Sequence, residues 1–116
     1  MIGLTSHHQY YFYAVPTDMR KGFDGLSGLV TSAMGMDPMN GSVYLFINRR
    51  RDRMKLLVWE SGGFMLYYKR LERGTFELPK TNATTQAVHL SWETLVLLFS
   101  GISLQSVRTH VRYKRA

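Results

Sequence analysis

The sequence predicts a single α+β domain in which an antiparallel meander sheet packs with about two helices. Its 116 residues and 45% hydrophobic content are enough for one core. Between residues 42 and 71, three apolar and aromatic stretches follow one another with turn-sized gaps, the pattern of consecutive strands. Apolar residues at helical spacing occur before and after them. We assign residues 1–103 to the domain and residues 104–116 to a basic C-terminal tail.

The N-terminal part predicts one strand followed by one helix. Residues 9–15 are rich in tyrosine and phenylalanine, and Pro16 ends this strand. Thr17 and Asp18 are favourable N-cap residues, so we expect the helix to begin there. The apolar residues at helical spacing are Met19, Phe23, Leu26 and Val30.

Three glycines at three-residue spacing fall within this predicted helix: Gly22, Gly25 and Gly28. We expect them to form a smooth edge that lets the helix approach the sheet closely. A phosphate-binding glycine loop is the alternative interpretation. It fits poorly, because no Gly-Lys-Ser/Thr sequence ends the segment.

Turn residues at 35–41 lead into three strands, predicted at 42–48, 53–60 and 64–71. A loop at 49–52 joins the first two strands, and Ser61-Gly62 forms a tight hairpin between the last two. After a loop at 74–82, the remaining elements are a short strand at 86–90 and a helix at 92–100. Ser91 caps this helix and Gly101 ends it. The tail from Leu104 fits a strand, a helix or a frayed coil equally well.

These loop lengths predict how the strands pair. The four-residue loop places Ile47 opposite Met54, and the hairpin turn places Val58 opposite Met65. One face of the sheet is then almost wholly aliphatic, and we expect the first helix to cover it. The other face gathers aromatic residues at the hairpin end and cations at the opposite end.

Arg53 lies opposite Arg70 in this register, so we expect a negative group nearby. Aromatic rings beside cations are typical of nucleic-acid binding, because bases stack on rings and arginines reach phosphates. The alternative is that the aromatic residues form a second core layer under the C-terminal helix, with solvated cations beside it. Both interpretations stay open on the sequence alone.

Charge gives the strongest functional signal. Fifteen basic and eight acidic residues give a formal net charge of +7 and a pI near 10.0, which favours a polyanionic partner. Between positions 49 and 55 there are five basic residues and one acid. Charge this dense on a short loop usually faces phosphate or an acidic partner.

Other features disfavour several classes of function. The absence of cysteine excludes disulfides and thiolate metal sites, and it agrees with a cytoplasmic location. No signal peptide and no membrane-spanning apolar run are visible, so we expect no membrane partner. The acids and histidines form no pattern suited to metal-assisted or nucleophilic catalysis. We therefore expect no enzymatic activity, no cofactor and no metal site.

Four longer motifs resemble one family closely: residues Pro16–Leu26, Phe46–Arg53, Lys55–Trp59 and Tyr67–Phe76. Across roughly residues 10–102 the chain resembles the TnpB-type accessory protein of the insertion-sequence-sixty-six (IS66) class of bacterial mobile elements, the product of the second reading frame. The resemblance implies a role in DNA transposition, beside a separate and larger transposase that carries the catalytic acids.

Two functions are consistent with the charge and the resemblance. The first is a non-catalytic accessory factor that binds DNA, expected to be the ends of the element, through a basic loop and a sheet face. Its predicted nucleic-acid-binding residues are Arg49, Arg50, Arg51, Arg53, Lys55, Tyr68, Lys69, Arg70 and Arg73. The alternative is an adaptor that docks on the transposase through Trp59 and Phe64.

The motif Arg20-Lys21-Gly22-Phe23-Asp24 receives no functional role from the sequence. Our structural interpretation is that Asp18 caps the helix and that Arg20 pairs with a nearby acid. The oligomeric state is also not assigned.

Overall fold

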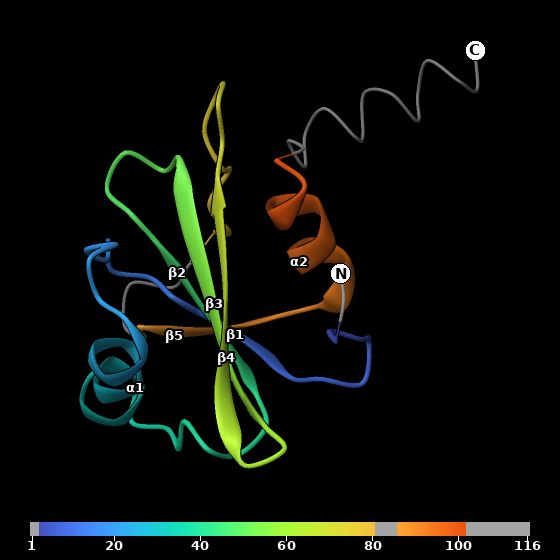
Figure 1. Cartoon of the computed structure of the whole chain (residues 1–116). Helices are drawn as coiled ribbons and strands as arrows, with labels where there is room; N and C mark the ends of the chain where they lie inside the picture. Colours follow the sequence, from blue (N-terminus) through green and yellow to red (C-terminus); the bar gives the residue numbers. More distant parts are fainter. Residues whose placement is uncertain (1–2, 81–85, 102–116) are drawn as a thin grey trace.

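A five-stranded sheet lies between two helices in the computed structural model, which describes residues 3–80 and 86–101 (Figure 1). The strands are β1 (Tyr10–Tyr13), β2 (Val43–Ile47), β3 (Arg53–Glu60), β4 (Gly63–Arg70) and β5 (Ala87–Leu90). The helices are α1 (Phe23–Ser32) and α2 (Trp92–Phe99). This architecture confirms the predicted α+β class. The predicted basic tail at 104–116 lies outside the described residues.

The strand order is β4-β3-β2-β1-β5. Strands β2, β3 and β4 form the predicted antiparallel meander. Strand β1 adds a parallel pair with β2, and β5 pairs antiparallel with β1 at the far edge. Parallel neighbours cannot be joined by a tight turn, so the chain crosses between them through a longer connection that contains α1.

The predicted register of the meander is confirmed. Ile47 pairs with Met54, and Val58 pairs with Met65. The hairpin between β3 and β4 turns at Ser61 and Gly62, whose φ angles are 51° and 80°. Two consecutive positive φ angles are typical of the tight turn that matches the twist of paired strands.

The prediction of which helix covers which face was wrong. The aliphatic face, which includes Leu45 and Leu56, packs against Leu98 of α2 rather than against α1. The other face forms a second core layer, as in the alternative interpretation, but under α1, where Phe46 packs with Leu26. Both faces are apolar, so alternation could not assign the helices. That choice depends on the side on which the β1–α1–β2 crossover passes.

The first helix also begins later than predicted, at Phe23 rather than near Asp18. The Asp18 carboxylate accepts a hydrogen bond from the Arg20 backbone N–H at 2.8 Å, so it closes a local turn instead of capping a helix. The smooth-edge interpretation of the glycines was wrong as well. A Cβ added at Gly22 or Gly28 would meet no heavy atom within 4 Å, so neither glycine is needed for close packing.

The second helix follows its prediction closely. The Ser91 hydroxyl accepts a hydrogen bond from the Thr94 backbone N–H at 3.1 Å, which is the expected N-cap. Gly101 follows the helix with a φ of 72°, as a helix stop requires.

The two-layered core can be tested by truncating one leucine on each side of the sheet. Leu26 and Leu98 are both fully buried. We expect Leu26→Ala and Leu98→Ala each to lower the free energy of unfolding by about 2–5 kcal/mol, measured by urea denaturation. The matched control is Phe23→Ala, because Phe23 is 48% exposed on α1. A leucine variant no more destabilised than this control would contradict the packing on its face.

Candidate nucleic-acid interface

The basic turn between β2 and β3 is held in shape by Asn48. Its side-chain oxygen accepts hydrogen bonds from the backbone N–H groups of Asp52 and Arg53, both at 3.0 Å. Its amide nitrogen donates to the Asp52 carboxylate at 2.7 Å. The arginines at 49–51 are exposed and form no ion pair with any described residue. The turn is therefore a rigid platform that presents unneutralised guanidinium groups.

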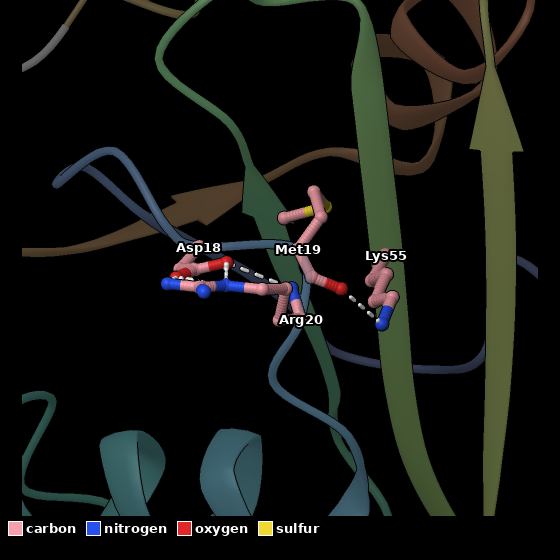
Figure 2. Close-up of polar contacts among 4 residues, drawn as sticks. All are labelled: Asp18, Met19, Arg20 and Lys55. Atoms are coloured by element: carbon pink, nitrogen blue, oxygen red, sulfur yellow. Dashed lines mark hydrogen bonds and ion pairs between the residues drawn. The ribbon is translucent and has the colours of Figure 1, made fainter.

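A second loop, residues 16–20, is fastened beside this turn. The Thr17 backbone N–H donates to the carbonyl of Ile47, the last residue of β2, at 2.9 Å. The Lys55 ammonium on β3 donates to the backbone carbonyls of Met19 at 2.7 Å and of Lys21 at 2.8 Å. Figure 2 shows the Lys55 side chain reaching from its strand to the Met19 carbonyl. Residues far apart in the sequence thus come to border one another.

The two loops enclose an open cleft of about 620 Å³, called here the arginine cleft. Guanidinium groups come from both walls. The charged residues that line the cleft are Arg20, Arg49, Arg50, Arg53, Asp18 and Asp52. Because the four cations outnumber the two acids, the cleft suits an anionic ligand.

Both acids of the cleft already have partners. Asp52 accepts from Asn48, as described above. Asp18 accepts from the Nη2 atom of Arg20 at 2.7 Å and from its Nε atom at 3.0 Å. These hydrogen bonds lower the pKa of Asp18 to about 2, so the carboxylate is ionised throughout the neutral range. The same contact raises the pKa of Arg20.

The pairing of Arg20 with a nearby acid agrees with our structural interpretation of that motif, but its place in the cleft was missed. Arg20 precedes the basic turn by a whole helix and a loop, and no local pattern links the two segments. The parallel pairing of β1 with β2, the Thr17–Ile47 hydrogen bond and the Lys55 contacts bring them together. A guanidinium that holds a carboxylate with two nitrogens has the geometry to hold phosphate in the same way.

Two lysines predicted to contact nucleic acid are directed elsewhere. Lys55 is only 7% exposed, and its ammonium serves the two carbonyls of the loop. Lys69 lies on the opposite face of the sheet, where its ammonium donates to the Phe99 carbonyl at 2.6 Å. We therefore do not include either lysine in the proposed interface, because each ammonium is occupied by carbonyl groups of the protein itself.

A smaller groove of about 350 Å³ lies beside the cleft and is called here the tyrosine groove. It is lined by Arg53, Tyr68, Arg70 and Glu72. Arg53 and Arg70 are directly opposed, as predicted, and the expected negative group comes from the chain itself. Glu72 accepts from Arg70 Nη2 at 2.9 Å and raises the pKa of that arginine. Arg73 is exposed on the loop that follows β4.

The two aromatic residues assigned to partner docking form a pair at the hairpin end of the sheet. The rings of Trp59 and Phe64 meet edge to face, with centroids 4.9 Å apart. Both side chains are half-buried, so neither is a fully exposed anchor. Met65, the next residue, is 45% exposed.

Within residues 3–80 and 86–101, no group of three or more histidine, aspartate or glutamate side chains could hold a metal ion. In the same part of the chain, neither helix is long and apolar enough to cross a membrane.

Comparison with known proteins finds one family. The family model described as IS66 Orf2 like protein matches residues 8–109. Two proteins of Sinorhizobium fredii are similar to this chain, and both are described as uncharacterized. Protein y4jC is 34% identical over 108 residues, which cover 93% of this chain and 91% of the relative. Protein y4hO is 37% identical over 87 residues, which cover 74% of this chain and 73% of the relative. No solved structure matches the chain significantly.

Lys55→Met tests whether Lys55 holds the neighbouring loop against β3. This variant has an apolar side chain of similar length but lacks the ammonium. Two backbone carbonyls are then left without their donor. We expect the free energy of unfolding to fall by about 1–3 kcal/mol. We also expect faster amide hydrogen exchange in residues 17–21, because the loop is no longer held against β3.

The matched control for this experiment is Lys69→Met. It makes the same chemical change on the opposite face, where a single carbonyl is involved. Exchange in residues 17–21 should be unaltered in the control. If Lys55→Met also left that exchange unaltered, the loop would be held by other contacts.

Proposed function

The chain belongs to the IS66 Orf2-like family, which implies an accessory role in transposition, and we propose that it performs this role by binding DNA at the arginine cleft. The contacts are to the sugar-phosphate backbone. Arg49, Arg50 and Arg53 supply guanidinium groups from the turn, and Arg20 supplies one from the opposite wall. The protein thereby positions DNA and leaves the chemistry to a separate transposase.

The observation that carries the proposal is the convergence of guanidinium groups from two separate loops. Charges that are only solvated at a surface do not need loops whose backbones are fixed by hydrogen bonds. Here Asn48 fixes one wall, and a buried ammonium fixes the other. Guanidinium groups carried on two such walls can bind phosphate oxygens with two nitrogens each and release counterions from DNA as they do so.

The family resemblance extends the proposal to partners and location. We infer that the DNA comprises the ends of the mobile element, that the transposase is a separate protein, and that this chain acts in the cytoplasm and is not itself an enzyme. The family is one of accessory proteins, which supports these inferences.

A second candidate function is docking on the transposase. The observation that favours it is the half-buried edge-to-face pair Trp59 and Phe64, at the end of the sheet farthest from the basic turn. Apolar side chains of this size are common anchors in protein interfaces. Because the two surfaces lie at opposite ends of β3, one molecule has room for both partners.

DNA binding at the cleft predicts a specific loss in the double variant Arg49→Ala/Arg50→Ala. Its affinity for duplex DNA, measured by fluorescence anisotropy, should fall. The slope of log K against log salt should flatten by about 0.9 for each phosphate that the variant no longer neutralises. A folded double variant with unchanged affinity and unchanged slope would exclude the cleft as the site.

The control for net charge is Thr31→Glu/Met39→Glu. It lowers the formal charge by two, as the arginine variant does, but on α1 and on the loop before β2, away from the basic turn. This control should bind much more tightly than the arginine variant. Equal losses of affinity in both would mean that overall charge, rather than the cleft, governs binding.

The docking candidate predicts that Trp59→Ala fails to recover the transposase in a pull-down while Arg49→Ala/Arg50→Ala retains it. The reason is that removing the indole deletes the largest side chain of the apolar pair. Circular dichroism must show that the variant is folded. Equal recovery by wild type and Trp59→Ala would exclude this patch as the docking surface.

A further inference from the structure

Tyr68 has an environment that the arginine cleft does not explain. Its side chain is 52% exposed, although its strand, β4, is paired with β3 along its whole length. The Lys55 ammonium lies 4.7 Å from the centroid of its ring. Its hydroxyl accepts a hydrogen bond from Arg53 Nη1 at 3.4 Å. The ring is therefore held in place by two cations and yet is half open to solvent.

The ring is held from the side of β3. Lys55 is the residue directly opposite Tyr68 on that strand, and Arg53 belongs to the same strand. Strand β4 is an edge of the sheet, with no further strand beyond it among the described residues. The cations therefore contact the ring from the side of β3. On the side away from β3, the described sheet ends.

The positive charge beneath the ring is not neutralised by the described residues. Lys55 binds backbone carbonyls and makes no ion pair. Arg53 lines both the arginine cleft and the tyrosine groove, so the two surfaces meet at this residue. Arg70 also lines the groove and is paired with Glu72. An aromatic platform flanked by guanidinium groups is the combination that single-stranded nucleic acid binds.

We propose that the tyrosine groove holds an unstacked nucleobase, which stacks on the open face of Tyr68 while Arg53 and Arg70 contact the adjoining phosphates. This inference rests on the proposed function, because it extends the DNA path from the arginine cleft to the edge of the sheet. It names the ligand more closely as DNA with at least one unpaired base.

The requirement for an unpaired base follows from stacking. In the interior of a duplex, the flat faces of each base are covered by its neighbours, so a ring on a sheet surface cannot reach them. A base at a single-stranded end, or one displaced from the helix, has a free face. Stacking on an aromatic side chain discriminates little between base types, because every base has such a face.

The test compares a single-stranded oligonucleotide, a blunt duplex, and the same duplex with a single-stranded overhang. Tyr68→Ala should bind the first and the third at least about fivefold more weakly than wild type. Its affinity for the blunt duplex should not change. Its salt slope should also match wild type, because the variant keeps every cation that neutralises a phosphate. Tyr68→Phe, which keeps the ring, should bind close to wild type.

A second readout reports stacking directly. A 2-aminopurine base in the single strand should lose fluorescence when wild type or Tyr68→Phe binds it, and should lose less with Tyr68→Leu. The leucine variant still covers the Lys55 side chain. A loss of affinity in this variant is therefore caused by loss of the aromatic ring and not by misfolding. Unchanged single-strand affinity in both Tyr68→Ala and Tyr68→Leu would overturn the inference, as would equal weakening on all three DNAs.

The failure of this inference is distinguishable from failure of the proposed function. If the arginine double variant loses duplex binding but the tyrosine variants behave as wild type on every DNA, only the tyrosine groove is excluded. If wild type binds none of the three DNAs at low salt, both proposals are overturned together.

Discussion

The buried ammonium of Lys55 is the contact on which the candidate site depends. Burying a charge without a carboxylate partner is unfavourable, and here two backbone carbonyls offset that cost. Their position fixes the loop at residues 17–21 beside β3, so that Arg20 enters the same cleft as the turn arginines. The same ammonium lies beneath the ring of Tyr68. One lysine therefore organises both the arginine cleft and the tyrosine groove, although it lines neither.

The position of these surfaces follows from the layering of the fold. Helix α1 covers one face of the sheet and α2 covers the other, so most of both faces is committed to the core (Figure 1). The turn between β2 and β3 lies outside these layers with its arginines exposed, and β4 forms an edge of the sheet. The concentrated positive charge lies at that turn, where it destabilises no buried layer. The sheet nevertheless holds the backbone that carries these arginines in place.

The sequence predicted the parts of this structure that local rules control. Loop lengths set the meander register, including the opposition of Arg53 and Arg70, and Ser91 and Gly101 marked the ends of α2. It could not predict contacts that depend on the parallel pair of β1 and β2. The burial of Lys55 and the position of Arg20 both depend on that pairing. A lysine inside a basic cluster has no sequence feature that separates a buried ammonium from an exposed one.

The central claim is that the arginine cleft binds DNA. The most direct measurement is fluorescence anisotropy of the wild-type protein with a labelled duplex carrying the element's terminal inverted repeats and with a scrambled duplex, across a salt series. We predict binding whose affinity falls steeply as salt rises, because several guanidinium groups displace counterions. Tighter binding to the repeats would identify end recognition. Absence of binding to either duplex at low salt would contradict the claim and leave docking on the transposase as the function to pursue.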